Sequence, residues 1–278
     1  MRHQAQSTSE HPTRVLGLDW SGARKAAAKI WACILQQRSG ESGSTIVYLD
    51  RPLDVHTPRS AVPEAMAIWL GQQDFSLAGF DFCFGLHPNQ AINFCSPQPD
   101  GQRPPSLYGA CLQAITPEQF RLQAAQEMKR KTDRIVKAPF APTNLRMYKQ
   151  THLGLLLISA LGKNQCSFLP WDAVDRDRRL VIEVLPANIQ RWLDPNRKSY
   201  KGRSLNAKSQ RAFLLSSLEQ RANIRLVQQS MRDQIIRDRE GDALDAVFAA
   251  VAAQQARNAG FMIEKEHYAD AMLEGWIF

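Results

Sequence analysis

The sequence predicts an α/β protein with a mixed sheet of five strands flanked by helices. Three short runs rich in β-branched and aromatic residues follow one another closely, which is typical of an antiparallel meander. A helical segment then connects this meander to a fourth strand, and a strand–helix–strand order places that strand parallel to a neighbour. Later in the chain, a continuous apolar run has the pattern of a strand that is buried on both faces.

The meander and the fourth strand belong to the first third of the chain. Between the third and fourth strands, apolar residues recur at helical spacing from Val62 to Leu70, and Gly71 ends the segment. The predicted strands of this part occupy residues 14–20, 28–36, 44–50 and 77–85.

The remainder of the chain is predicted to be mostly helical. Residues 86–106 are rich in Pro, Gly and polar residues, which predicts a long loop that could act as a lid. The fifth strand, at residues 179–186, ends at Pro186 because proline cannot continue a central strand. Helical patterns occupy residues 116–131, 151–162, 187–193, 204–222 and 239–253.

We expect one folded domain. Residues 1–13 are polar and predict a disordered N-terminal tail. Residues 14–278 predict a single domain with a loop and helical insertion around residues 87–150. The sequence contains no internal repeat that would indicate a solenoid or a second copy of the core.

The composition indicates an ordinary cytoplasmic protein. Of its 278 residues, 44% are hydrophobic and 22% are charged, and the net charge of +8 favours anionic partners such as nucleic acid. The five cysteines form no C-x-x-C pair and the six histidines are scattered, so we expect reduced thiols and no zinc site. The chain has neither an apolar signal segment nor an apolar run of about 18 residues, which predicts no membrane partner.

Asp81 lies inside an apolar strand. Period-two alternation places Phe80, Phe82 and Phe84 on one face of this strand and Asp81 on the other. Burying an unpaired carboxylate costs several kcal/mol, so such a residue is usually paired with a cation, hydrogen-bonded or bound to a metal. Two interpretations of Asp81 are therefore equally open: a structural ion pair with an arginine, and a functional role.

Two more carboxylates lie in predicted strands. Asp19 ends the first strand, where "DWSG" also fits a type I turn with Asp first and Gly fourth. Glu183 lies between Ile182 and Val184 in the fifth strand, and its alternative role is an ion pair with an arginine of the nearby "DRDRR".

Asp242 and Asp245 open an apolar helical segment and share one helix face. Their structural interpretation is strong, because Asp242 suits an N-cap and both acids suit the positive end of the helix dipole. From Ala246 to Ala256 the segment has no charged residue, so we expect it to pack against the sheet.

These acids are expected to converge. If the first and fourth strands are adjacent, Asp19 and Asp81 lie side by side, with Asp242 and Asp245 opposite. Carboxylates that converge without a counter-charge repel one another, and hard divalent cations with oxygen ligands resolve that repulsion. The four aspartates therefore predict a site for Mg²⁺ or Mn²⁺.

Several short segments together resemble a known family. In order, they are "GLDWSG", "GFDFCFGL", "KTDR", "PTNLRMYKQTHLG", "VIEVLP", "YKGR", "GDALDA" and the terminal "EGWI". The chain resembles the family of predicted ribonuclease-H-like nucleases, domain of unknown function 429, and its late D-x-x-D helix is similar to that of RuvC-type resolvases. The resemblance implies a ribonuclease H-like fold, with Asp19, Asp81, Asp242 and Asp245 as metal ligands and Glu183 as a further catalytic carboxylate.

The expected activity is hydrolysis of phosphodiester bonds in nucleic acid with two Mg²⁺ or Mn²⁺ ions, giving 5′-phosphate and 3′-hydroxyl ends. The basic clusters at residues 129–134 and 197–203 are candidates for holding phosphates, although such runs are often solvated surface. The sequence leaves open whether the substrate is DNA or RNA, and also the oligomeric state. The candidate substrate-binding residues are Arg134, Arg146, Lys201, Arg203 and Tyr200, the last by stacking on a base.

Two other functions compete with this prediction. A phosphotransferase of the actin, heat-shock chaperone and sugar-kinase superfamily would share the core, and "GLDWSGARK" loosely resembles its phosphate loop. That superfamily uses two copies of the core, whereas one meander in 278 residues leaves room for one. A nucleic-acid-binding domain without catalysis is the second alternative, but four acids near phosphate weaken binding unless a metal neutralises them.

Overall fold

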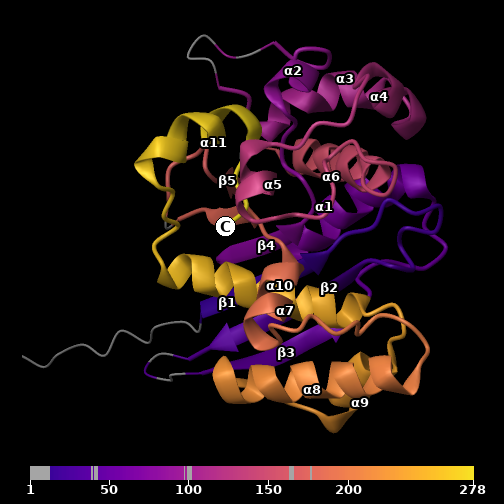
Figure 1. The fold of residues 1–278 in the computed structure, drawn as a ribbon, viewed down its shortest axis with the longest axis vertical. Coiled ribbons are helices and arrows are strands. Elements are labelled where there is room, and N and C mark those ends of the chain that lie inside the picture. Colours follow the sequence, from indigo (N-terminus) through magenta and orange to yellow (C-terminus); the bar gives the residue numbers. More distant parts are fainter. Residues whose placement is uncertain are drawn as a thin grey trace, which may run out of the picture.

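A mixed sheet of seven strands forms the centre of the computed structural model, which describes residues 13–38, 40, 43–96, 98, 102–162, 166–175 and 177–278. The strand order is β5-β6-β4-β1-β2-β3-β7. The central strands β4, β1, β2 and β3 are labelled in Figure 1. Residues 1–12 of the expected tail lie outside the described residues. The strands are β1 (Thr13–Asp19), β2 (Trp31–Gln37), β3 (Ser44–Asp50), β4 (Leu77–Asp81), β5 (Cys166–Phe168), β6 (Arg179–Glu183) and β7 (Ile224–Leu226).

The sheet combines the expected meander with parallel strands. β1, β2 and β3 pair antiparallel in succession, and β4 pairs parallel with β1 on the other side. β6 then pairs parallel with β4. The prediction of a mixed α/β sheet flanked by helices is confirmed, as is the adjacency of the first and fourth strands.

The predicted number of five strands is wrong, because β5 and β7 add a strand at each edge. Each has three residues, which is too short for period-two alternation to be recognised in the sequence. Their extended conformation depends on partners: β5 pairs parallel with β6, and β7 pairs parallel with β3. The chain end adds an isolated parallel bridge between Ile277 and Glu183, the last residue of β6.

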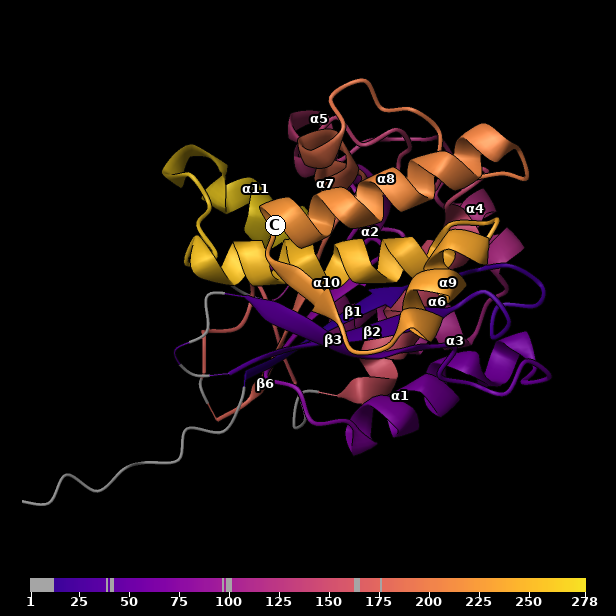
Figure 2. The ribbon, with the colours of Figure 1, turned by 90° about the horizontal axis from the view of Figure 1, so that it is seen from below.

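Helices cover both faces of the sheet (Figure 2). α10 lies across one face, on the same side as α7, α8 and α9, while α1 and α6 cover the opposite face. Within the described residues, every helix is too short or too polar to cross a membrane. The helices are α1 (Val62–Gln72), α2 (Pro88–Ala91), α3 (Gly109–Gln113), α4 (Pro117–Gln123), α5 (Lys131–Ile135), α6 (Tyr148–Leu161), α7 (Pro186–Leu193), α8 (Leu205–Arg221), α9 (Gln229–Arg237), α10 (Asp242–Asn258) and α11 (Tyr268–Glu274), with short 3₁₀ segments at Arg59–Ala61, Pro105–Tyr108 and Lys265–His267.

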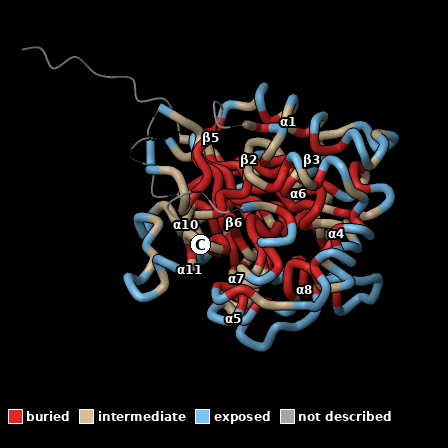
Figure 3. The backbone as a smooth tube through the Cα atoms, turned by 90° about the horizontal axis from the view of Figure 1, so that it is seen from above, coloured by how far each residue is buried: buried red, intermediate tan, exposed pale blue. Residues whose placement is uncertain are grey.

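The core follows the alternation of the strands. Val15 packs in the cluster on the α10 face, whereas Leu16 and Leu18 pack with α1 and α6 on the other face. The buried part of the backbone forms a continuous centre through the sheet, with exposed loops around it (Figure 3). Phe80, with Phe82 and Phe84, packs on the face of α1 and α6, as the alternation predicts.

α10 lies unusually close to the sheet. A Cβ on Gly17 of β1 would come within 2.2 Å of the Ala246 carbonyl oxygen, and one on Gly79 of β4 within 2.6 Å of the Ala249 oxygen. Glycines in the strands and alanines in the helix therefore permit the backbones to approach. All residues from Ala243 to Ala253 are buried, which confirms that this helix packs against the sheet.

The region between β4 and α6 contains more and shorter helices than the sequence predicts. The helix expected over residues 116–131 is wrong, because α4 ends at Gln123 and Ala125 has a left-handed φ of 63°. A separate helix, α5, begins at Lys131, where the Asp133 side chain accepts the Arg130 backbone N–H at 2.9 Å. The loop expected over residues 86–106 contains α2 and the start of a 3₁₀ segment.

Candidate functional site

Asp19 and Asp81 end two adjacent parallel strands. They are register partners, as are Gly17 and Gly79 two residues earlier. Because side chains alternate along a strand, each aspartate points to the same face as the glycine two residues before it, which is the face covered by α10. The two carboxylates thus lie side by side at the carboxyl end of the strands.

The first turn of α10 supplies the other two aspartates. Gly17 lies against Ala246 and Ala250, so the turn that precedes Ala246 extends beyond the strand end toward Asp19. Asp19, Asp81, Asp242 and Asp245 all line one cavity of about 530 Å³. The structure therefore brings together the four aspartates that the sequence singles out.

Asp242 does not cap α10. Gly241 is the N-cap residue, with a left-handed φ of 81°, and Asp242 is the first helical residue. The Asp238 carboxylate accepts the Ala243 N–H at 2.8 Å instead, and so satisfies a free donor of the first turn. The carboxylate of Asp242 is consequently free to face the cavity.

Lys201 provides a counter-charge that the sequence interpretation did not include. Its Nζ lies 2.5 Å from Asp245 Oδ2 and 4.0 Å from Asp242 Oδ1. The other oxygen, Asp245 Oδ1, accepts the hydroxyl hydrogen of Tyr200 at 2.5 Å. Both oxygens of Asp245 are thus engaged, and one ammonium group offsets part of the charge of four carboxylates.

The other lysines of the cavity wall are paired with different acids. Lys29 Nζ lies 3.5 Å from Glu240 Oε2, and Lys149 Nζ lies 3.2 Å from Glu118 Oε1. These pairs leave Lys201 as the ammonium group that the described structure places on the aspartates.

Burial and mutual repulsion raise the pKa values of Asp19, Asp81 and Asp242. Burial raises the pKa of Asp19 well above its usual value, and Asp245, Asp242 and Asp81 raise it further while Lys201 opposes the shift. Burial and then Asp245 raise the pKa of Asp81 to about 8, although a hydrogen bond from Asp19 lowers it. Burial also raises the pKa of Asp242 to about 6. Full ionisation of these aspartates would therefore place more negative charge in the cavity than the Lys201 ammonium alone offsets.

The donor set suits a hard divalent cation. The four side chains offer oxygen ligands, and burial keeps the neighbouring Cys83 thiol protonated by raising its pKa. Their spacing is wider than that of ligands gathered on one ion, because no three of the aspartates have oxygens within 4.8 Å of one another in the described structure. Lys201 lies on Asp245, so it would have to release that carboxylate when a cation binds.

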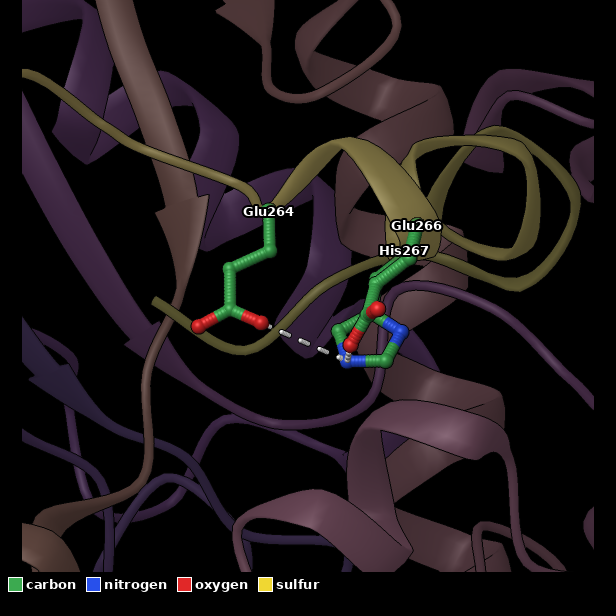
Figure 4. A group of neighbouring side chains, drawn as sticks. All are labelled: Glu264, Glu266 and His267. Atoms are coloured by element: carbon green, nitrogen blue, oxygen red, sulfur yellow. Dashed lines mark ion pairs between the residues drawn. The ribbon is translucent and has the colours of Figure 1, made fainter.

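A separate surface group does have close spacing. Glu264, Glu266 and His267 place one potential ligand atom each within 4.8 Å of the others (Figure 4). Both glutamates are exposed, and the His267 ring stacks on Trp276 with centroids 5.6 Å apart. Exposed acidic groups of this kind are common without an ion, so we assign this group no role.

Glu183 has the ion-pair role that was the alternative interpretation of the sequence. Its Oε1 lies 2.5 Å from Arg130 Nη2, and its Oε2 accepts from Arg130 Nη1 at 2.8 Å and from the Phe84 N–H at 2.8 Å. Alternation also places Glu183 with Val181 on the α1 and α6 face, opposite the aspartates. Glu183 is one of the residues around the cavity, but its carboxylate is fully engaged, and its partner is Arg130, not an arginine of "DRDRR".

Arg130 is therefore not part of a solvated phosphate-binding cluster. Its side chain is fully buried and also pairs with Asp133 Oδ1 at 2.8 Å. In the sequence, the "KRK" run has the composition of an exposed segment. Only the fold shows that its middle residue, Arg130, points inward. The spacing of Arg130 and Asp133, three residues apart at a helix start, is the signal that could have identified the pair.

The predicted substrate-binding residues are divided between the cavity and the surface. Arg146 lines the cavity, whereas Arg134 and Arg203 are exposed and do not line it. Tyr200 is buried against Phe248, with ring centroids 6.1 Å apart, so its ring is not accessible to a base. The stacking role expected for Tyr200 is thus not available in this structure.

Gln150 and Phe140 are site residues that the sequence analysis did not identify. Both line the cavity, and Gln150 Nε2 donates to the Asp81 carbonyl oxygen at 2.6 Å. The Arg146 guanidinium lies 5.2 Å from the centroid of the Phe140 ring. Phe140 and Gln150 flank the segment that contains "NLRMY", but nothing in their residue types alone indicates a site.

No protein-family model matches this chain, and no curated protein and no solved structure is significantly similar to it.

Proposed function

We propose that the chain is a metal-dependent nuclease with a ribonuclease H-like fold. One observation carries this proposal: four aspartates from β1, β4 and α10 line one cavity, and among the described residues only the Lys201 ammonium is paired with them. Carboxylates gathered in this way repel one another when ionised, and as oxygen ligands they favour Mg²⁺ or Mn²⁺ as the counter-charge.

The order of the strands supports the proposed fold. An antiparallel meander is followed by a parallel strand next to β1, as the resemblance to ribonuclease-H-like nucleases implies. The first acid at the end of β1, the second at the end of β4 and the last two in the first turn of α10 also follow that order. β5 and β7 extend the sheet at its edges, away from the central strands that carry Asp19 and Asp81.

In the proposed hydrolysis, each residue of the site would have a separate role. Asp19, Asp81, Asp242 and Asp245 would hold two Mg²⁺ or Mn²⁺ ions. Bound divalent ions would activate a water molecule and stabilise the developing charge on the phosphate and the leaving oxygen. The Tyr200 hydroxyl would fix the orientation of Asp245.

Lys201 would be the residue that changes partner. In the described structure its ammonium neutralises Asp245, and half of its side chain is exposed, so it can turn toward the open cavity. Once released, it would hold the charge of a substrate phosphate. This preserves the phosphate-binding role proposed for Lys201 from the sequence.

The structure gives less support to the two alternatives. A phosphotransferase of the actin type would need a second copy of the core, and the described residues form one sheet. A domain that binds nucleic acid without catalysis would gain nothing from four acids beside the phosphates. We therefore keep the nuclease as the proposed function.

The direct test is Mn²⁺-dependent cleavage of single- and double-stranded DNA and RNA. The variants Asp81→Asn and Asp245→Asn remove charge with little change in shape, and Asp177→Asn, at an exposed position, is the control. We expect the control to cleave like the wild type and the first two to lose at least about 100-fold in rate. Wild-type cleavage by folded Asp81→Asn and Asp245→Asn would refute the assignment.

A further inference from the structure

The cavity has a second wall that differs in chemistry from the aspartates. It is formed by the loop between α5 and α6, where Leu145 is 67% exposed and Pro139 is also exposed. Arg146 lines the same wall, and its guanidinium lies over the ring of Phe140. An apolar surface with one arginine thus shares a cavity with the acid cluster.

This second wall is fixed directly beside the acids. Gln150, four residues after Arg146 and in the first turn of α6, donates to the Asp81 carbonyl oxygen at 2.6 Å. The loop after β1 is pressed onto the same turn of α6, because a Cβ on Gly22 would come within 2.2 Å of the Gln150 nitrogen. The start of α6 therefore contacts the backbone segments that carry Asp19 and Asp81.

The Arg146 guanidinium is accessible from the cavity. Its charge is not neutralised by an ion pair with any carboxylate in the described part of the chain, and the residue is exposed. The guanidinium carbon lies 5.2 Å from the Phe140 ring centroid, and the exposed remainder of the group can receive a second planar group. Guanidinium planes and aromatic rings are the surfaces on which unpaired bases stack.

We propose that this wall is a stacking platform for an unpaired nucleobase, so that the nuclease acts on single-stranded nucleic acid or on an unpaired end. This inference rests on the proposed function, because it assigns the aspartates to the phosphate and the Arg146–Phe140 pair to the base. A nucleotide has one anionic part and one planar apolar part, and the two walls match them. A base within a duplex is stacked on both faces and cannot present one to Arg146.

The volume of the cavity suits an unpaired nucleotide as its ligand. A cavity of about 530 Å³ falls in the range of sites that enclose a ligand of a few tens of atoms, roughly 300–1,000 Å³. One or two nucleotides are ligands of that size, whereas a duplex would have to lie across the opening.

Binding of labelled strands tests the platform without depending on cleavage. We would measure fluorescence anisotropy in Ca²⁺ with an oligothymidylate, an abasic strand of equal length and a duplex, and check on a denaturing gel that each stays intact. We expect the oligothymidylate to bind about tenfold more tightly than the abasic strand, because stacking strengthens binding of each base. It should also bind more tightly than the duplex.

Arg146→Lys is the decisive variant, because it keeps the charge and removes the planar group. We expect it to bind the oligothymidylate and the abasic strand equally. Arg121→Lys is the matched control: Arg121 is exposed and lies 5.9 Å from the Tyr148 ring centroid, but it does not line the cavity. It should keep the wild-type preference.

Three results would overturn the platform: equal binding of the oligothymidylate and the abasic strand by the wild type, absence of oligothymidylate binding, or an unchanged preference in Arg146→Lys. The cleavage assay separates this failure from that of the proposed function. A protein that cleaves with Mn²⁺ but ignores bases refutes the platform alone. A protein that prefers bases but neither binds Mn²⁺ nor cleaves refutes the nuclease alone.

Discussion

Lys201 Nζ lies 2.5 Å from Asp245 Oδ2, while the Tyr200 hydroxyl donates to the other oxygen of the same carboxylate. Two consecutive residues thus engage both oxygens of one proposed metal ligand. The backbone of this pair is itself held, because Arg211 Nη1 donates to the Tyr200 carbonyl oxygen at 2.5 Å and the Gly202 N–H donates to Arg239 at 2.7 Å. The backbone is therefore fixed, and the half-exposed Lys201 side chain is the part that can change position. A cation has to compete with its ammonium group for the Asp245 carboxylate.

Removal of that competitor should strengthen metal binding. In Lys201→Met, the aspartates lose their ammonium and retain their full mutual repulsion, so we expect the affinity for Mn²⁺ to rise about three- to tenfold. Isothermal titration calorimetry measures the affinity directly. Lys208→Met, at an exposed position of α8, should leave it unchanged. A weaker or unchanged affinity in Lys201→Met would mean that Lys201 does not compete with the ion.

Loss of the Tyr200 hydroxyl should destabilise the fold. Tyr200→Phe keeps the ring that packs on Phe248 but leaves a buried oxygen of Asp245 without its donor. We expect the free energy of unfolding to fall by about 1–3 kcal/mol, as measured by urea denaturation. Tyr268→Phe, at an exposed position, is the matched control and should unfold like the wild type. Equal stability of Tyr200→Phe would show that water replaces the hydroxyl.

The buried Arg130 should be far more important for stability than its neighbours in the sequence. Arg130→Met leaves the carboxylates of Asp133 and Glu183 buried without their cation, so we expect a loss of about 3–5 kcal/mol. Arg134→Met, at an exposed position of α5, should change stability by less than about 0.5 kcal/mol. Similar unfolding midpoints for the two variants would contradict the buried network.

The central part of the site could be predicted from the sequence. Asp19 and Asp81 stand at the ends of strands whose apolar patterns are strong, and a strand–helix–strand order makes those strands parallel neighbours. The two aspartates of α10 are predictable for the same reason, because the apolar run after them can only pack against the sheet. The hydrophobic pattern and the order of the elements are sufficient to predict the position of an aspartate where the element that carries it has a strong apolar pattern.

The remaining features depend on tertiary contacts. Lys201 lies in a loop whose course is set by the buried Arg211 and by Arg239, and no local pattern shows that its ammonium reaches Asp245. The burial of Arg130 likewise depends on Glu183, 53 residues later in the chain. The short edge strands exist because β6 and β3 offer free edges. Sequence periodicity contains no signal for such distant partners.

Glu274 should make stability depend on pH. Burial raises the pKa of this glutamate from 4.5 to about 7, although a hydrogen bond from the Lys131 N–H and the charge of Arg130 lower it. The folded state thus favours the protonated form, so stability is lost as the pH rises from about 4.5 to about 7. In Glu274→Gln, which stays neutral, this loss should be smaller by on the order of 2 kcal/mol. Urea denaturation at pH 5 and pH 8 measures the difference, with Glu64→Gln, at an exposed position of α1, as the control. If Glu274→Gln and the wild type lose equal stability between these pH values, Glu274 is not the group that titrates.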